Sequence, residues 1–261
     1  MKRFFAVVHA IGEREFAGKL SYRFSFIFNL ISMMLIFVAI FYVGKMIPPE
    51  FVPGGDYFTM TVIGIGIYTW IGTLASAPRA ALMMEMSFGT FETIILLLPS
   101  MEVYLLASSL YFALLALART GFILLVPFIL GWRCPPEALV MLLPVFLLSG
   151  LAGIGLGLLQ TGLDLRVRRA GRLVSLFGGG GAILSGVYFP VALLPVPLQM
   201  LSGLIPATHA IDAARTILIG HALPLRAGGA MLFLAIVFCI AGHGFFRYAE
   251  NAVRRDGSFL S

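Results

Sequence analysis

Charged side chains are scarce in this 261-residue sequence. Only 11% of the residues are charged, 60% are hydrophobic, and the mean hydropathy is +1.00. A soluble domain carries about 25% charged residues and about 45–50% apolar ones. This composition therefore excludes an ordinary soluble protein, and it predicts an all-α polytopic membrane protein whose helices cross the bilayer.

Cysteine and histidine are sparse too, which limits metal and disulfide chemistry. The two cysteines, Cys134 and Cys239, show no metal-ligand spacing and form no disulfide framework. None of the four histidines has another histidine four residues away. Because zinc ligands usually cluster in sequence, we expect no metal site in this chain.

Lysine is rare, and the residues beside each lysine exclude an ATP-binding P-loop in this sequence. A P-loop requires G-x-x-x-x-G-K-[ST], in which backbone amides and the lysine hold phosphates. Lys19 follows Gly18 but precedes Leu20, and Lys45 follows Gly44 but precedes Met46. No G-x-S-x-G nucleophile elbow is present either. We therefore expect no catalytic residue and no cofactor in this chain, which is not an enzyme by itself.

What the sequence does contain is apolar runs of membrane-spanning length. Six runs approach the ~20 residues that a crossing helix needs, and they cover residues 24–44, 57–77, 103–131, 138–160, 173–189 and 229–246. Residues 1–23 combine basic side chains with an apolar stripe, which is typical of a helix in the membrane interface, although a plain cytoplasmic extension fits them as well. No repeat or linker divides the chain, so we expect one transmembrane domain over residues 1–261.

The basic residues predict the orientation of these helices. With both termini in the cytoplasm, the cytoplasmic side holds most of the lysines and arginines, and the outer side holds only Lys45, Arg133, Arg215 and Arg226. Cytoplasmic loops carry such an excess in membrane proteins. We therefore expect a multi-pass protein of the inner or plasma membrane, whose net charge of +6 reflects orientation and no nucleic-acid partner.

A proline-rich stretch follows the fifth run. Pro190, Pro195, Pro197 and Pro206 interrupt residues 185–215, and proline prevents a straight helix because it removes a backbone donor and clashes with the preceding turn. Irregular backbone at membrane depth is tolerated only where protein or a cavity surrounds it. Residues 187–215 are therefore predicted to form a re-entrant helical hairpin on the outer face, between spans five and six.

Four further features complete the predictions from the residues. Residues 78–102 are only partly apolar, and we expect a helical hairpin or interfacial helix in the cytoplasm. Arg119 lies within the third run, where a charge is costly; it either attracts an anionic substrate or pairs with a neighbouring helix. Asp212 and Arg215, three residues apart, are expected to pair locally. Gly153 and Gly157 form a small-xxx-small pair that permits close helix packing.

Two groups of motifs resemble one family. SGVYFP, LLPVPLQ and PATHAIDAAR occur in this order between residues 185 and 215, and Glu85 is followed by GTFETIILLLPS over residues 89–100. Together they resemble the permease subunits of type-2 ABC exporters. The resemblance covers essentially the whole chain; one departure is Ala207, where a larger apolar residue is common.

The resemblance implies a half-transporter. Two permeases would form the pathway, either two copies of this chain or this chain and a homologue. Two separate ATP-binding subunits would bind ATP and Mg²⁺ on the cytoplasmic side. The residues that would couple to these subunits are Glu85, Gly89, Thr90, Phe91, Glu92 and Pro99. The residues of the outer gate would be Gly186, Phe189, Pro190, Pro195, Pro206, His209 and Arg215.

The substrate class stays open at this point. An amphiphilic, lipid-like, glycan or drug substrate fits the apolar outer segment, and outward transport is implied by the family alone. The alternative functions are an ATP-independent carrier or channel, and the membrane anchor of a complex. The first alternative is weakened because intramembrane charge is too sparse for an obvious proton relay.

Overall fold

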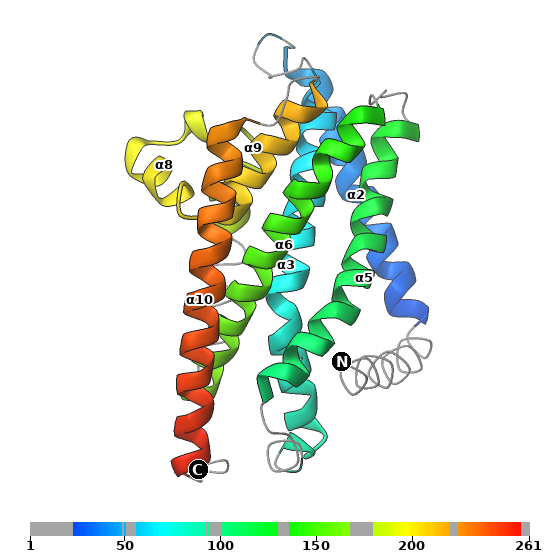
Figure 1. Cartoon of the computed structure of the whole chain (residues 1–261). Coiled ribbons are helices and arrows are strands. Elements are labelled where there is room, and N and C mark those ends of the chain that lie inside the picture. Colours follow the sequence, from blue (N-terminus) through cyan, green and yellow to red (C-terminus); the bar gives the residue numbers. More distant parts are fainter. Residues whose placement is uncertain are drawn as a thin grey trace.

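The structure is a computed structural model, and it describes residues 23–48, 50, 56–91, 93, 101–129, 136–167, 180–219 and 224–256. Within these residues every regular element is a helix. Four long helices make up most of the molecule (Figure 1), and they are α3 (Tyr57–Ser87), α5 (Met101–Ile129), α6 (Pro136–Arg166) and α10 (Leu225–Asp256). Helix α2 (Arg23–Met46) lies at one side, and three short helices follow the gap after α6: η2 (Val191–Leu193), α8 (Val196–Ser202) and α9 (Pro206–Leu218).

The four long helices confirm the predicted membrane class. Each contains a stretch that is long and apolar enough to cross a bilayer. The expected first span coincides with α2. The apolar stretch of α2 is Met34–Met46, which is shorter than the stretches in the four long helices. Most of the expected fifth span, residues 173–189, lies outside the described residues. The count of six spans therefore stays a prediction.

Helix α3 begins where the sequence predicts and ends later than expected. The Asp56 carboxylate caps it by accepting hydrogen bonds from the backbone N–H groups of Phe58 and Thr59, at 3.1 and 3.2 Å, which satisfies donors that have no partner inside the helix. The helix then continues through Pro78 to Ser87. The first ten residues of the 78–102 segment are therefore the end of α3, and not a separate helix.

Glycines of α6 explain how closely the long helices pack. A Cβ at Gly157 would lie 2.6 Å from the Ala75 carbonyl and 3.0 Å from the Pro78 ring, and one at Gly153 would lie 3.0 Å from the Ile71 carbonyl. The small-xxx-small pair thus packs against α3, as its pattern predicts. Because Gly157 leaves room beside Pro78, the proline ring packs within a continuous helix.

Two ends of the molecule are distinguished in Figure 1. The α9 end, at the top of the view, carries α8, α9 and the last residues of α2. The Glu85 end, at the bottom, carries the last turns of α3, α6 and α10 and the first turn of α5. Helix α3 has 31 residues and so measures ~46 Å at 1.5 Å per residue, against a hydrocarbon core of ~30 Å. The helix ends therefore project beyond the bilayer core.

Candidate functional site

A partly buried arginine organises the α9 end. The Arg215 guanidinium donates hydrogen bonds to the carbonyl of Met60 near the start of α3, at 3.1 and 3.2 Å, and to those of Gly186 and Val187, both at 2.8 Å. Burial lowers the pKa of Arg215 to about 10, because desolvation penalises the charged form and the nearby Asp212 only partly offsets this. The side chain therefore stays charged at neutral pH.

The partners of Arg215 correct the expected local pair with Asp212. Asp212 is exposed, and no ion pair between the two side chains occurs in the described part of the chain. The guanidinium binds backbone carbonyls from α3 and from the turn before η2 instead. Five N–H donors in a planar fork suit several carbonyls at once, so Arg215 ties three segments of the chain together.

The turn that Arg215 holds has a defined geometry at Gly186. This glycine has φ +75°, in the region that favours glycine. Its N–H donates to the Ile183 carbonyl at 3.2 Å, and the Val187 N–H donates to the Ala182 carbonyl at 3.3 Å. These two bonds are the Schellman arrangement that ends a helix. A Cβ at Gly186 would also lie 2.8 Å from Val191 Cγ2. Both the positive φ and the lack of space therefore disfavour a larger residue at this position.

The predicted prolines stand where short helices begin. Pro190 and Pro195 immediately precede η2 and α8, and Pro206 is the first residue of α9. Proline suits these positions because its missing N–H has no helical partner there. His209 Nε2 lies 2.9 Å from the Gly203 carbonyl, across the turn between α8 and α9. Phe189 is half-buried.

The two faces of this segment differ. Helix α9 buries small and apolar side chains, among them Ala210 and Ile211, in the cluster that α3 and α6 also build. In contrast, α8 exposes Val196, Met200 and Leu201. The predicted outer-gate residues therefore form one structural unit that α9 and Arg215 anchor to the bundle and that α8 extends outward (Figure 1).

A buried carboxylate organises the opposite end. Glu85 is fully buried near the end of α3. Its Oε1 accepts from the Tyr104 hydroxyl of α5 at 2.5 Å, and its Oε2 accepts from the Thr90 hydroxyl. The side chain therefore links α3, the following turn and α5. It lies inside the molecule, and not on a surface where a partner subunit would meet it.

The turn after Glu85 repeats the geometry seen at Gly186. Gly89 has φ +68°, its N–H donates to the Met86 carbonyl at 3.3 Å, and the Thr90 N–H donates to the Glu85 carbonyl at 3.0 Å. This is a second Schellman helix end. Phe91 then turns inward and is buried with Leu82 and Tyr104, while residues 86–90 are exposed. Two other predicted coupling residues, Glu92 and Pro99, lie outside the described residues.

Sequence reasoning missed the ion pairs that join the long helices at the Glu85 end. Glu102 of α5 binds His243 Nδ1 at 2.5 Å and Arg247 Nε at 3.0 Å, both on α10. Arg79 of α3 binds Asp164 of α6 at 2.5 Å. These partners are 85 to 145 residues apart in sequence, so no local spacing reveals them. The Glu102 contacts fix the start of α5 against α10.

A second buried glutamate joins the same helices. Glu250 of α10 accepts a hydrogen bond from the Met101 backbone N–H at 3.0 Å, and it pairs with Arg254 at 2.8 Å. The carboxylate thereby satisfies a donor in the first turn of α5, where negative charge is favoured. An acidic residue four positions before an arginine is a readable signal for the helical pair, but not for the contact with Met101.

Arg119 lies on the exposed side of α5. No hydrogen bond or ion pair to it occurs among the described residues, so the alternative of a pair with a neighbouring helix finds no partner there. The described residues also contain no cluster of three or more histidine, cysteine, aspartate or glutamate residues that could hold a metal ion.

A family model described as ABC-2 type transporter matches residues 8–219. Nodulation protein J of Neorhizobium galegae is 31% identical over 108 residues, which are 40% of this chain and 41% of that protein. The chain thus matches less than half the length of this curated relative, whereas the family match includes both ends of the bundle.

Proposed function

The chain belongs to the ABC-2 type transporter family, and we propose that it is the membrane subunit of an ABC exporter driven by ATP hydrolysed in a separate subunit. The observation that carries the proposal is the family match over residues 8–219. The sequence adds that no lysine stands in a P-loop. If the pathway is driven by ATP, the nucleotide site is supplied by a partner subunit.

The proposed assembly contains two permeases and two ATP-binding subunits, with ATP and Mg²⁺ bound to the latter. The permeases are two copies of this chain, or this chain with a homologue, in the inner or plasma membrane. Among the described residues, Arg79, Arg166, Arg247, Arg254 and Arg255 lie in the half of the molecule that contains the Glu85 end. By the positive-inside rule this end faces the cytoplasm, with both termini on that side and the α9 end outside.

The proposed contact with the ATP-binding subunit is the exposed turn over residues 86–90. Glu85 holds this turn from within through Thr90 and Tyr104. Phe88 stands at its tip with 68% of its surface exposed, and Gly89 permits the reversal of the chain. We assign Phe88 as the side chain that enters the partner's groove, and Glu85 as the residue that keeps the turn rigid, so that a push on the turn moves α3 and α5.

At the other end, we propose that the unit formed by η2, α8 and α9 closes the pathway from outside. Its exposed apolar side chains on α8 support an amphiphilic, lipid-like, glycan or drug substrate. Arg119 belongs to the same proposal, because an arginine that faces lipid at mid-span costs roughly 2.5–3.5 kcal/mol. It therefore faces the second permease, as a structural charge, or the substrate path.

The test is a reconstituted complex. Affinity purification of this chain from its native membranes in mild detergent should bring down a chain with a G-x-x-x-x-G-K-[ST] motif. In liposomes with that partner, Phe88→Ala should lower the permease-stimulated ATPase rate about tenfold, because an aromatic side chain at the centre of an interface carries much of its binding energy.

Phe233→Ala is the matched control, because Phe233 of α10 is 66% exposed and lies far from the turn. It should leave the ATPase rate unchanged. Equal rates in the Phe88→Ala variant and the original protein would refute the coupling surface. Absence of any P-loop chain from the purified material would instead favour an ATP-independent carrier or an anchoring role.

A further inference from the structure

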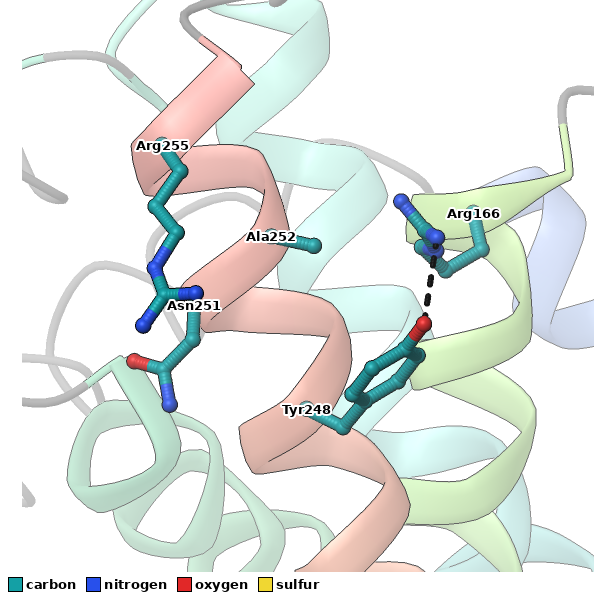
Figure 2. A pocket seen from close by; sticks show the side chains of 5 residues that line it. All are labelled: Arg166, Tyr248, Asn251, Ala252 and Arg255. Carbon is teal, nitrogen blue, oxygen red and sulfur yellow. Dashed lines mark hydrogen bonds between the residues drawn. The ribbon is translucent and has the colours of Figure 1, made fainter.

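A pocket of about 370 Å³ opens at the Glu85 end, between the last turns of α6 and α10. Figure 2 shows Arg166 of α6 beside Tyr248, and Arg255 beside Asn251 farther along α10. Ala252 lies between them. Helices α6 and α10 thus bring two arginines from distant parts of the chain to one hollow.

The pocket follows from the spacing of residues on α10. Tyr248, Asn251, Ala252 and Arg255 are separated by three, one and three positions, so they share one face of the helix. The Arg166 guanidinium lies 5.3 Å from the centroid of the Tyr248 ring, and its Nη2 is 3.4 Å from the Tyr248 hydroxyl. The ring therefore orients Arg166 along the pocket wall.

The lining has the chemistry of an anion site. Its described lining residues offer two guanidinium groups, an amide and a phenol, and none of them is a carboxylate. Two carboxylates close to the lining residues in sequence are engaged elsewhere, since Asp164 binds Arg79 and Glu250 binds Arg254. A planar guanidinium group can donate two parallel N–H hydrogen bonds to the oxygens of one phosphate group. A phosphate group thus fits the charge and the donors of this pocket.

Its place in the fold favours a phosphate carried by lipid. The pocket lies where two candidate membrane spans, Val140–Arg166 and Leu225–Arg255, reach their ends. The centroids of the Phe245 and Tyr248 rings lie 6.3 Å apart in the same region. Aromatic side chains are enriched at the headgroup level of membranes. Basic pockets between such helices on the cytoplasmic side bind anionic headgroups.

Arginine in the last turn of a helix also offsets the helix dipole, and Arg166 and Arg255 both occupy such positions. That role requires neither a shared hollow nor a tyrosine that orients one guanidinium. We propose that the pocket formed by Arg166, Tyr248, Asn251 and Arg255 binds the phosphate group of an anionic phospholipid headgroup. The site is independent of ATP and of transport.

The test uses the purified full-length permease without nucleotide or partner. Phosphatidylglycerol is titrated into the detergent-solubilised protein, and bound lipid is counted by native mass spectrometry. The original protein should retain at least one phosphatidylglycerol that phosphatidylcholine does not replace. The Arg166→Gln, Arg255→Gln double variant should bind it about thirtyfold more weakly, because each surface arginine contributes about 1 kcal/mol to anionic-lipid binding.

Arg226→Gln is the matched control, since Arg226 is an exposed arginine in the first turn of α10, at the other end of the same helix. It should leave the lipid affinity unchanged. Arg255→Gln alone provides the answer if the double variant does not fold, because Arg255 is exposed.

Three results would overturn the proposal. One is an unchanged phosphatidylglycerol affinity in the double variant. Another is displacement of the bound phosphatidylglycerol by inorganic phosphate alone, which would indicate a site for free phosphate. The third is an unchanged lipid affinity together with loss of the ATP-binding chain when the double variant is purified from its native membranes, which would make the pocket a protein contact.

Discussion

At the scale of single residues, two charged side chains hold the two ends of the molecule. Arg215 binds the carbonyls of the Gly186 turn and of α3, and Glu85 binds Thr90 and Tyr104 around the Gly89 turn. In both places a helix ends with a glycine at positive φ, and a charged side chain fixes the residues that follow. These contacts keep both turns rigid.

Replacing Arg215 with glutamine should lower the free energy of unfolding by about 3 kcal/mol. The carbonyls of Met60, Gly186 and Val187 would lose their charged donor, and each buried acceptor left unpaired costs about 1–3 kcal/mol. Thermal unfolding of the detergent-solubilised protein measures the change. Arg226→Gln, on an exposed side chain, should be neutral; an equal melting temperature for both variants would contradict the role of Arg215.

At the scale of elements, α6 holds the bundle because it presents different glycines to two neighbours. Gly153 and Gly157 pack against α3, and Gly155 packs against α10. A Cβ at Gly242 would lie 2.1 Å from the Gly155 carbonyl, and one at Gly155 would lie 2.5 Å from the Phe238 backbone. The α6–α10 crossing is therefore a contact between backbones, and it also fixes the pocket at the ends of these two helices.

Two alanine substitutions on α10 should act with opposite signs. Gly242→Ala should destabilise the protein by about 1–3 kcal/mol, because the added methyl group forces α10 away from α6. Gly244→Ala meets no atom within 4 Å and should stabilise the protein by about 0.5–1 kcal/mol, because alanine loses less conformational freedom than glycine in a helix. Denaturant unfolding in detergent compares the two; the same sign for both would contradict the close crossing.

At the scale of the whole molecule, the sorting of charge between the two ends implies an orientation. All basic residues of α3, α6 and α10 except Arg226 lie in the half that contains the Glu85 end. The prolines at the starts of η2, α8 and α9 and the carbonyls that Arg215 binds belong to the α9 end. The proposed transporter requires such an asymmetry, since its proposed motor and gate act at opposite faces.

Labelling with a membrane-impermeant maleimide should report this orientation. In a background with Cys134→Ser and Cys239→Ser, Leu204→Cys between α8 and α9 should react in intact cells. Ser87→Cys at the end of α3 should react only after the cells are permeabilised. Both native side chains are exposed, so accessibility depends on sidedness alone. The reverse pattern would invert the proposed topology.

The helices were largely predictable from the sequence, and their interruptions only in part. Apolar runs predicted the long helices, and the start of α3 at Tyr57 is confirmed. Pro190, Pro195 and Pro206 stand at starts of helices as expected of proline, but Pro78 lies inside α3. Nothing near Pro78 in sequence distinguishes it from the others, because the space for its ring comes from Gly157 on another helix.

Composition and the positions of apolar runs determined by themselves that this chain is a helical membrane protein, because the bilayer restricts spanning segments to structures with internally satisfied backbones. The groups that the Arg215 and Glu85 side chains bind were decided only by the tertiary structure. Local spacing suggested Asp212 for Arg215, whereas the fold supplies carbonyls 28 to 155 residues away. Glu85 was predicted to meet a partner subunit, yet the packing of α3 on α5 buries it completely. Periodicity and hydropathy describe one chain segment at a time, and a buried charge finds its partners only when separate segments meet.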